Sequence, residues 1–188
     1  MNYVEPLRSK IKIAQIKQYL LDNEKPRNYL FFVLGINFAL RIGDLLSLRV
    51  EDVRNSNSNL KEIFYIREHK TNKQKCIQIN KVSRQALIYY FSKVDAEQND
   101  WLFPGRGNKA MDRTWCWELI NKWVKKVGLE GKFGTHSLRK TFGYQARKQG
   151  VSIELIQAKF QHSTPEVTRR YIGITDDEVA KIEKMVNI

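Results

Sequence analysis

Cysteine is scarce in this chain of 188 residues. Its two cysteines, Cys76 and Cys116, belong to no CxxC motif and no Cys/His cluster. The sequence therefore offers neither a disulfide framework nor zinc-ligand spacing. We expect both cysteines to be reduced packing residues of a cytosolic protein.

Long hydrophobic runs are missing as well. The longest, from Tyr29 to Leu40, has 12 residues, which is too short to cross a bilayer. The N-terminus has no apolar region of the kind that a secretion signal needs. Proline and glycine number only 4 and 10, and 42% of the residues are hydrophobic, so the chain can form a packed core. We expect one globular domain, residues 1–188, in the cytoplasm.

What the chain has in excess is positive charge. It contains 33 Lys and Arg residues against 20 Asp and Glu residues, which gives a formal net charge of +13. Such an excess indicates an extended anionic partner, most commonly the backbone of a nucleic acid. A basic surface that serves solubility is the alternative.

Hydrophobic periodicity predicts a fold that is mainly α with a small antiparallel β-sheet (α+β). Residues 62–70 and 73–80 are rich in Ile, Phe and Tyr and flank a polar turn, which is typical of a β-hairpin. The segments expected to be helical are 11–23, 29–40, 43–53, 82–94, 112–129, 135–150, 152–161, 164–172 and 175–188.

Several helix ends have clear signals. Asp112 is the expected N-cap and Gly128 the expected C′ residue of one helix, and Ser152 and Pro165 mark the starts of two others. Three tryptophans lie in residues 112–129. We expect them to pack in the core rather than to stack on nucleic-acid bases.

Residues with chemical potential follow one another in the last third of the chain. His136 and Arg139 share a face of a predicted helix, His162 comes at the end of the next helix, and Tyr171 follows nine residues later. Arg41 lies far upstream, at the junction of two predicted helices. An HxxR pair alone usually belongs to a solvated surface, and a lone tyrosine usually anchors a helix, so only the combination indicates a site.

This combination resembles the tyrosine recombinases of the phage integrase family. The resemblance covers about Ile11 to Ile174, and the order of its motifs is more specific than any single one. Gln161 departs from the pattern, because the family usually has glycine there. The motifs that carry the resemblance are ALRIGDLLSLRVEDV, HKTNKQKCIQI, WLFP, HSLRKTF and QHSTPEVTRRYI.

The resemblance implies a catalytic role for each matching residue. Tyr171 would be the nucleophile on a DNA phosphodiester, and Arg41 and Arg139 would hold the non-bridging oxygens. His136 would act as the general base toward the tyrosine, and His162 would be a further donor to the phosphate.

The hairpin would supply the general acid on the leaving 5′ oxygen. The resemblance implies Lys70 for this role, and Lys73 and Lys75 on the same hairpin are alternatives. Asp44 matches the acidic position that supports the first arginine in the family. We expect His69, beside Lys70, to be exposed and without a role.

The chemistry requires these residue types whatever the family. A tyrosine has a pKa near 10, so holding it as phenolate at neutral pH costs about 4 kcal/mol, which a base and nearby cations must supply. Arginine forks match phosphate oxygens, and each donor aimed at the transition-state charge can contribute about 3 kcal/mol. The three histidines have no metal-ligand spacing, so we expect no metal and no cofactor.

Double-stranded DNA is the expected partner. The resemblance further implies a homotetramer on DNA that exchanges strands in pairs, a monomer or weak oligomer without DNA, and an accessory DNA-bending protein. No membrane partner is expected. Residues 175–188 are a candidate helix for docking onto a neighbouring copy. The basic residues that we expect to contact phosphates are Arg106, Lys109, Arg113, Lys122, Lys125, Lys126, Lys140, Arg147 and Lys148.

Two other functions remain open at the level of sequence. A type IB topoisomerase uses the same nucleophile but relaxes supercoils as a monomer, and a DNA-binding regulator could keep the scaffold without catalysis. Family members usually carry an N-terminal helical domain that clamps DNA, and we expect this domain to be absent here, since about ten residues precede the first predicted helix.

Overall fold

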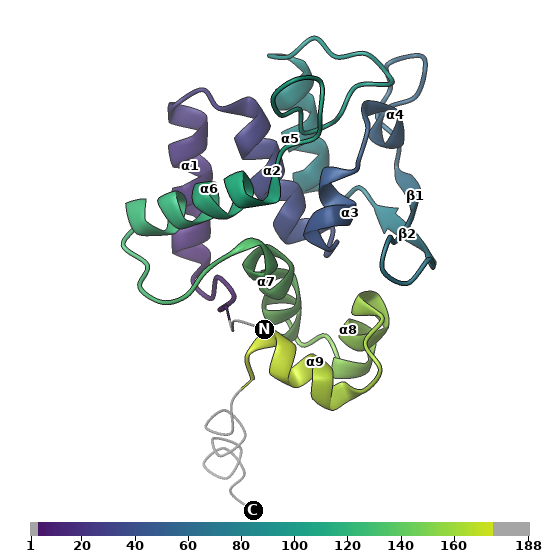
Figure 1. The fold of residues 1–188 in the computed structure, drawn as a ribbon. Helices are drawn as coiled ribbons and strands as arrows, with labels where there is room; N and C mark the ends of the chain where they lie inside the picture. Colours follow the sequence, from purple (N-terminus) through teal and green to yellow (C-terminus); the bar gives the residue numbers. More distant parts are fainter. Residues whose placement is uncertain (1–3, 175–188) are drawn as a thin grey trace, which may run out of the picture.

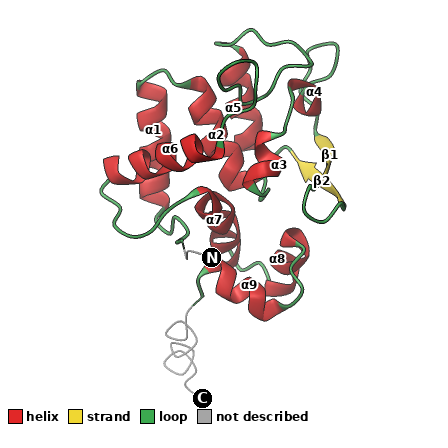
Figure 2. Cartoon of the chain, viewed as in Figure 1, coloured by secondary structure: helices red, strands yellow, loops and turns green. Residues whose placement is uncertain are grey.

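The computed structural model describes residues 4–174, drawn in Figure 1 and coloured by secondary structure in Figure 2. The described part is mainly helical with one antiparallel two-stranded sheet, so the predicted fold class is confirmed. Its elements are α1 Lys10–Asp22, α2 Pro26–Asn37, α3 Ile42–Leu46, α4 Val50–Val53, β1 Ile63–Arg67, β2 Gln74–Gln78, α5 Lys81–Phe91, α6 Arg113–Lys126, α7 Thr135–Lys148, α8 Ile153–Phe160 and α9 Pro165–Ile172.

Helix α2 is the centre of the main core. Its residues are apolar nearly all round, so it can be buried on several sides at once, and it packs against α1, α5 and α7. The aromatic rings of Phe31 and Phe32 contact Trp123 of α6. The short segment that ends at Arg41 therefore follows directly from a helix that is packed on several sides.

The hairpin has one face toward this core. Phe64 pairs with Ile77 and Ile66 with Lys75 on the inward face, whereas Tyr65 pairs with Cys76 on the outward face. The expected packing role is therefore wrong for Cys76, which is exposed, and Cys116 alone is buried. A lysine on the inward face of a strand needs a polar partner, and the site described below contains one.

The predicted helix over residues 43–53 is broken into α3 and α4. The backbone of Arg49 forms an antiparallel bridge with Trp101, and Leu102 donates to the carbonyl of Leu48. This pairing takes the backbone groups that a continuous helix would use. Tertiary contact with a distant loop therefore overrides the local helical pattern.

The expected core role is wrong for two of the three tryptophans on α6. The buried face of this helix includes Leu119 and Trp123, and the side chains of Trp115 and Trp117 lie outside that face, 47% and 51% exposed. The predicted caps hold, because Asp112 accepts from two backbone amides and Gly128 has a positive φ just beyond the helix.

A second, smaller cluster holds the C-terminal helices. Helix α7 lies between the main body and the α8–α9 pair, and α8 and α9 contact both each other and α7 (Figure 1). The cluster is built from Ile153, Ile156, Phe160 and Ile172, with Ala39 from the segment after α2. The helix proposed to dock onto a neighbouring copy, residues 175–188, lies outside the described residues.

Gly143 allows this small cluster to approach α7. A Cβ atom at position 143 would lie 2.5 Å from Ile172 Cγ2 and 2.7 Å from Phe160 Cε2. We predict that Gly143→Ala lowers the free energy of unfolding by about 1–3 kcal/mol, because overpacking outweighs the helix propensity gained by alanine. Urea unfolding of the purified variant measures the change.

Gly43→Ala is the matched control for this prediction. Its new Cβ atom would meet only the guanidinium of Arg113, the movable end of an exposed side chain. We expect the control to unfold close to the wild type. A Gly143→Ala protein as stable as Gly43→Ala would contradict the close packing of α8 and α9 on α7.

Candidate active site

The structure brings five of the six expected catalytic residues together from three parts of the chain. Arg41 is the N-cap residue of α3, His136 and Arg139 lie on the first two turns of α7, and His162 follows α8. Tyr171 is on the last turn of α9. The packing of α8 and α9 on α7 is what brings these segments together.

Tyr171 lies among rings and cations. Its hydroxyl oxygen is 3.4 Å from Nδ1 of His136, and its ring centroid is 4.9 Å from that of His162. Burial raises the pKa of Tyr171, while the charges of Arg139 and Arg41 lower it in opposition. The tyrosine is therefore a neutral phenol near pH 7, with a proton acceptor beside it.

Both histidines of the site are neutral near pH 7. Burial, followed by the charges of Arg139, Lys140, Arg41 and Arg113, lowers the pKa of His136. Burial, followed by the charges of Arg139, Arg41 and Lys75, lowers the pKa of His162 to about 4. A neutral imidazole can accept a proton from a phenol, which an imidazolium cannot.

The position of His162 is set by its neighbours on the chain. Its Nδ1 lies 3.1 Å from the hydroxyl oxygen of Thr168, which is fully buried on α9. Gln161, where the family usually has glycine, has a left-handed backbone with φ of 55° at the end of α8. The glycine preference thus has a physical cause, since a residue with a side chain adopts this conformation at a cost.

Arg139 is buried and only partly satisfied. Its side chain is 3% exposed, and Nη2 donates to the carbonyl of Phe160 over 2.8 Å. The other terminal nitrogen, Nη1, is buried without a hydrogen-bond partner. A buried guanidinium nitrogen without a partner is costly, so it is a suitable donor for an anionic ligand.

Glu68 is a member of the site that the sequence analysis missed. It is fully buried, forms an ion pair and hydrogen bond with Arg41, and lies 3.3 Å from Nζ of Lys75 and 3.8 Å from Nη1 of Arg139. Burial raises its pKa, but Lys75, Arg41 and Thr71 outweigh that effect and hold the pKa below its usual value. The available signal was strand alternation, because residue 68 continues the inward face of residues 64 and 66.

Asp44 does not contact Arg41 as the family pattern implied. Its Oδ1 accepts from the backbone amide of His69 and lies 2.9 Å from Nδ1 of the same residue. The ring of His69 is exposed, as expected, but its Nδ1 atom has a partner in the carboxylate of Asp44. Asp44 therefore anchors the hairpin to α3, and the carboxylate in contact with Arg41 is Glu68.

The hairpin lysines differ in where they lie. Lys70 and Lys73 are exposed in the turn, whereas Lys75 is buried on β2. Burial and the charge of Arg139 lower the pKa of Lys75 to about 8, although Glu68 acts to raise it. Lys75 is therefore the hairpin lysine that lies in the cluster, and Lys70 lies outside it in this structure.

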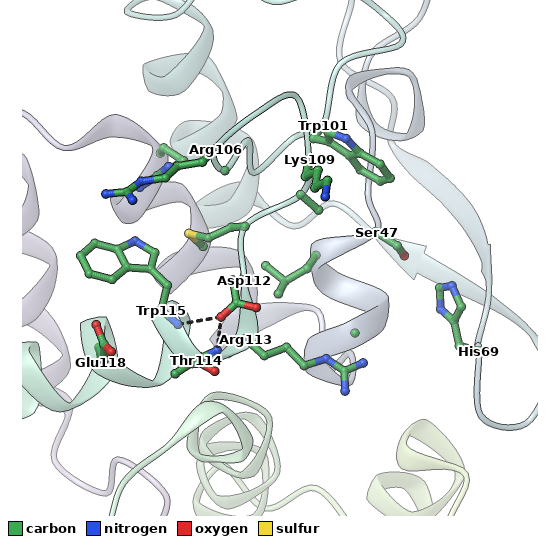
Figure 3. A pocket seen from close by; sticks show the side chains of 16 residues that line it. Ser47, His69, Trp101, Arg106, Lys109, Asp112, Arg113, Thr114, Trp115 and Glu118 are labelled. Atoms are coloured by element: carbon green, nitrogen blue, oxygen red, sulfur yellow. Dashed lines mark hydrogen bonds between the residues drawn. The ribbon is translucent and has the colours of Figure 1, made fainter.

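A hollow of about 1030 Å³ lies between α3, the N-terminus of α6 and the loop before α6, and its lining includes His69, the chain neighbour of Glu68. Three of the nine expected DNA contacts line it: Arg106, Lys109 and Arg113. Figure 3 shows Arg113 extending toward α3, where a Cβ atom at Gly43 would lie 2.5 Å from its Nη2. The hollow thus has a cationic wall that faces α3, the helix that begins after Arg41.

The remaining expected DNA contacts are divided. Lys140 is a correction: it is buried, and its ammonium donates to the carbonyl of Val4 and lies 5.2 Å from the ring centroid of Tyr171. It faces the interior because α7 packs against the N-terminal segment there. The other five are exposed on α6 and at the end of α7: Lys122, Lys125, Lys126, Arg147 and Lys148.

In residues 4–174, no group of three or more His, Cys, Asp or Glu side chains is arranged to hold a metal ion. No helix among them is long and apolar enough to cross a membrane.

Comparison with known proteins gives consistent results. Residues 10–178 match the model of the phage integrase family. The chain is 41% identical over 178 residues to the probable integrase/recombinase YoeC of Bacillus subtilis, covering 94% of this chain and 93% of YoeC. The crystal structure of XerA recombinase superposes with a TM-score of 0.76 at 21% identity, covering 98% of this chain and 66% of that one.

A Tn1549 transposon integrase solved in complex with circular intermediate DNA is similar in fold, with a TM-score of 0.68 and 19% identity. The match covers all of this chain and 66% of the integrase chain. Other curated relatives are longer, and this chain spans about half of their length. Since both the family model and a relative at 41% identity match most of its length, the chain belongs to the phage integrase family of tyrosine recombinases.

Proposed function

We propose that this chain is a site-specific DNA recombinase or integrase that cleaves and rejoins DNA strands through a 3′-phosphotyrosyl intermediate on Tyr171. The observation that carries the proposal is the position of the Tyr171 hydroxyl, 3.4 Å from a neutral His136 and within the field of Arg41 and Arg139. A buried phenol that merely anchored a helix would need no such neighbours.

The bond changes follow from this arrangement. The Tyr171 oxygen attacks the phosphorus as its proton passes to His136, and the bond from phosphorus to the 5′ oxygen breaks. Arg41 and Arg139 would hold the non-bridging oxygens, with His162 as a further donor, and stabilise the added charge of the transition state. The bond energy is retained in the phosphotyrosyl link, so a free 5′ hydroxyl of a partner strand can reverse the step.

The departing 5′ oxygen needs a proton from the hairpin. Lys70 remains the proposed general acid, because the resemblance assigns the role to the lysine that begins the turn. Lys75 is the second candidate, and a specific observation favours it: it lies in the cluster, and its pKa of about 8 suits an acid near neutral pH. The two candidates make different predictions for substrate and pH.

The expected DNA surface includes the hollow and the exposed basic residues of α6 and α7. The formal charge of +13 supports binding to a phosphate backbone, and the Tn1549 integrase of similar fold is bound to DNA. We further propose assembly as a homotetramer on two duplexes, a monomer or weak oligomer in the absence of DNA, and assistance from a DNA-bending protein.

Tyr171→Phe tests the nucleophile. It removes the attacking oxygen alone, so we expect no covalent complex with a nicked suicide duplex, where wild type gives a detergent-stable band on a denaturing gel. Tyr144→Phe, which removes the same atom from a tyrosine on α7, is the matched control and keeps the band. A wild-type protein without the band on any candidate site would favour a non-catalytic DNA-binding regulator.

Relaxation of a supercoiled plasmid without a target site distinguishes a site-specific recombinase from a type IB topoisomerase. A recombinase needs its own site on both partners, so we expect the plasmid to stay supercoiled. Relaxation that depends on Tyr171 would favour an activity of the type IB topoisomerase kind.

Alanine variants of the three hairpin lysines identify the acid. Loss of the acid should slow single-turnover cleavage by about 10²–10⁴-fold. When sulfur replaces the 5′ bridging oxygen of the substrate, the leaving group can depart without receiving a proton, because a thiol is far more acidic than an alcohol. We expect Lys70→Ala to cleave the oxygen substrate slowly and the sulfur substrate at the wild-type rate. If Lys75→Ala alone behaves in this way, Lys75 is the general acid instead.

The pH profile gives an independent reading. His136 must be neutral, and its pKa lies below the ordinary 6.5, so cleavage should fall only as the pH drops below that value. If Lys75 is the acid it must be protonated, so cleavage should also fall as the pH rises through about 8. An alkaline loss near pH 8 that persists in Lys75→Ala would exclude Lys75 as its cause.

Salt dependence tests the basic surface. If six or more phosphates are contacted, the affinity for DNA should fall about a thousandfold or more between 50 and 200 mM salt. Removal of Arg106 or Lys109 should lower the slope of log K against log salt by about one each. Lys93→Ala, an exposed lysine beyond α5, is the control and should leave the slope unchanged. A flat salt response would contradict binding through this surface.

A further inference from the structure

Glu68 is a fully buried carboxylate among the cations of the site, and the mechanism above does not use it. It comes just after β1, on the inward face of the hairpin. Its Oε2 contacts Arg41 and accepts from the hydroxyl of Thr71 over 3.0 Å, and its Oε1 lies 3.3 Å from Nζ of Lys75. Arg139 completes the set, with Nη1 at 3.8 Å from Oε1.

The three cations around Glu68 come from three separate elements. Arg41 precedes α3, Lys75 is on β2 and Arg139 is on α7. Like charges gathered around one carboxylate repel one another, and the repulsion is least screened between Lys75 and Arg139, which are both buried. Lys159 of α8 adds to this repulsion, because its charge also acts on Lys75. A single anion at the centre is therefore needed to keep the three together.

Glu68 occupies only part of the hydrogen-bonding capacity of the two arginines. It contacts Nη1 of Arg41 and approaches Nη1 of Arg139, and neither contact involves Nη2. The Arg139 Nη1 atom is buried without a hydrogen bond, so it still has a proton to donate. With three cations against one carboxylate, the cluster keeps a net positive charge and can accept one more anion.

We propose that Glu68 is a positioning residue that holds Arg41, Arg139 and Lys75 at the separations needed by the scissile phosphate before DNA arrives. This inference rests on the proposed function, because it takes the two arginines as the phosphate clamp. Glu68 acts through these side chains and does not itself touch the reacting atoms. Its contacts with Arg41 and Arg139 also tie the hairpin to the clamp.

Glu68→Gln removes the charge while keeping the shape of the side chain. The positioning role predicts that single-turnover cleavage falls about 10- to 100-fold, because a positioned group displaced by about 1 Å can cost that much. DNA affinity should not weaken, since the variant carries one more net positive charge. Glu62→Gln, an exposed glutamate of the same hairpin, is the matched control and should leave both quantities unchanged.

A measurement without DNA tests the contact itself. Phenylglyoxal modifies arginines that are accessible and unpaired, and peptide mass spectrometry reports the rate at each one. We expect Arg41 to react more slowly than the exposed Arg113 in the wild type, and to react several-fold faster in Glu68→Gln. Glu68→Asp keeps the charge on a shorter side chain, so it should restore part of the protection and part of the cleavage rate.

The outcomes are distinct. A Glu68→Gln variant that cleaves as fast as the wild type, or faster, overturns the inference and makes Glu68 a competitor of the phosphate. Unchanged Arg41 modification in that variant also overturns it. If Glu68→Gln does not fold, Glu68→Asp and the wild-type comparison of Arg41 with Arg113 still decide. Failure of the wild type to link to any DNA would sink the proposed function, whereas the modification rates would still report on Glu68.

Discussion

Mutual repulsion among buried cations is the constraint on which this site depends. Arg41, Arg139 and Lys75 approach one carboxylate, Glu68, from the segment before α3, from α7 and from β2. Without that anion, the three elements would be driven apart or their side chains would turn to solvent. The same excess of positive charge lowers the pKa of His136 and His162 and opposes the rise that burial causes in the pKa of Tyr171, so the protonation of all three side chains has one electrostatic origin.

Tyr171 reaches this field because a small hydrophobic cluster docks on α7. Phe160 and Ile172 pack against Gly143, and this contact fixes the distance between α9 and the face of α7 that carries His136. Arg139 donates to the carbonyl of Phe160, so the clamp and the docked helices share a hydrogen bond. Packing of a few apolar side chains thus sets the distance between the phenol of Tyr171 and the imidazole of His136.

Much of the fold followed from local patterns. Helix ends at Ser152, Pro165 and Asp112 follow from capping chemistry that acts within one turn, and the hairpin follows from alternation around a polar turn. The break between α3 and α4 could not be predicted, because it arises from pairing of Arg49 with Trp101, 52 positions away (101 − 49). Glu68 was missed, and Lys75 was only an alternative to Lys70, for a related reason: the burial of both depends on packing against Arg41 and Arg139, which are distant in sequence.

The sequence by itself determined which chemistry is available: a phenol, two imidazoles, two guanidiniums and a set of hairpin lysines, in an order typical of one family, on a chain with a large positive charge. These properties reside in residue types and short spacings. The tertiary structure decided that the carboxylate of Glu68 and the ammonium of Lys75 lie in the cluster. It also decided that Asp44 binds His69 while Glu68 binds Arg41, and that Lys140 faces inward. Such choices depend on which buried charges meet, and burial is a property of the packed chain rather than of any segment.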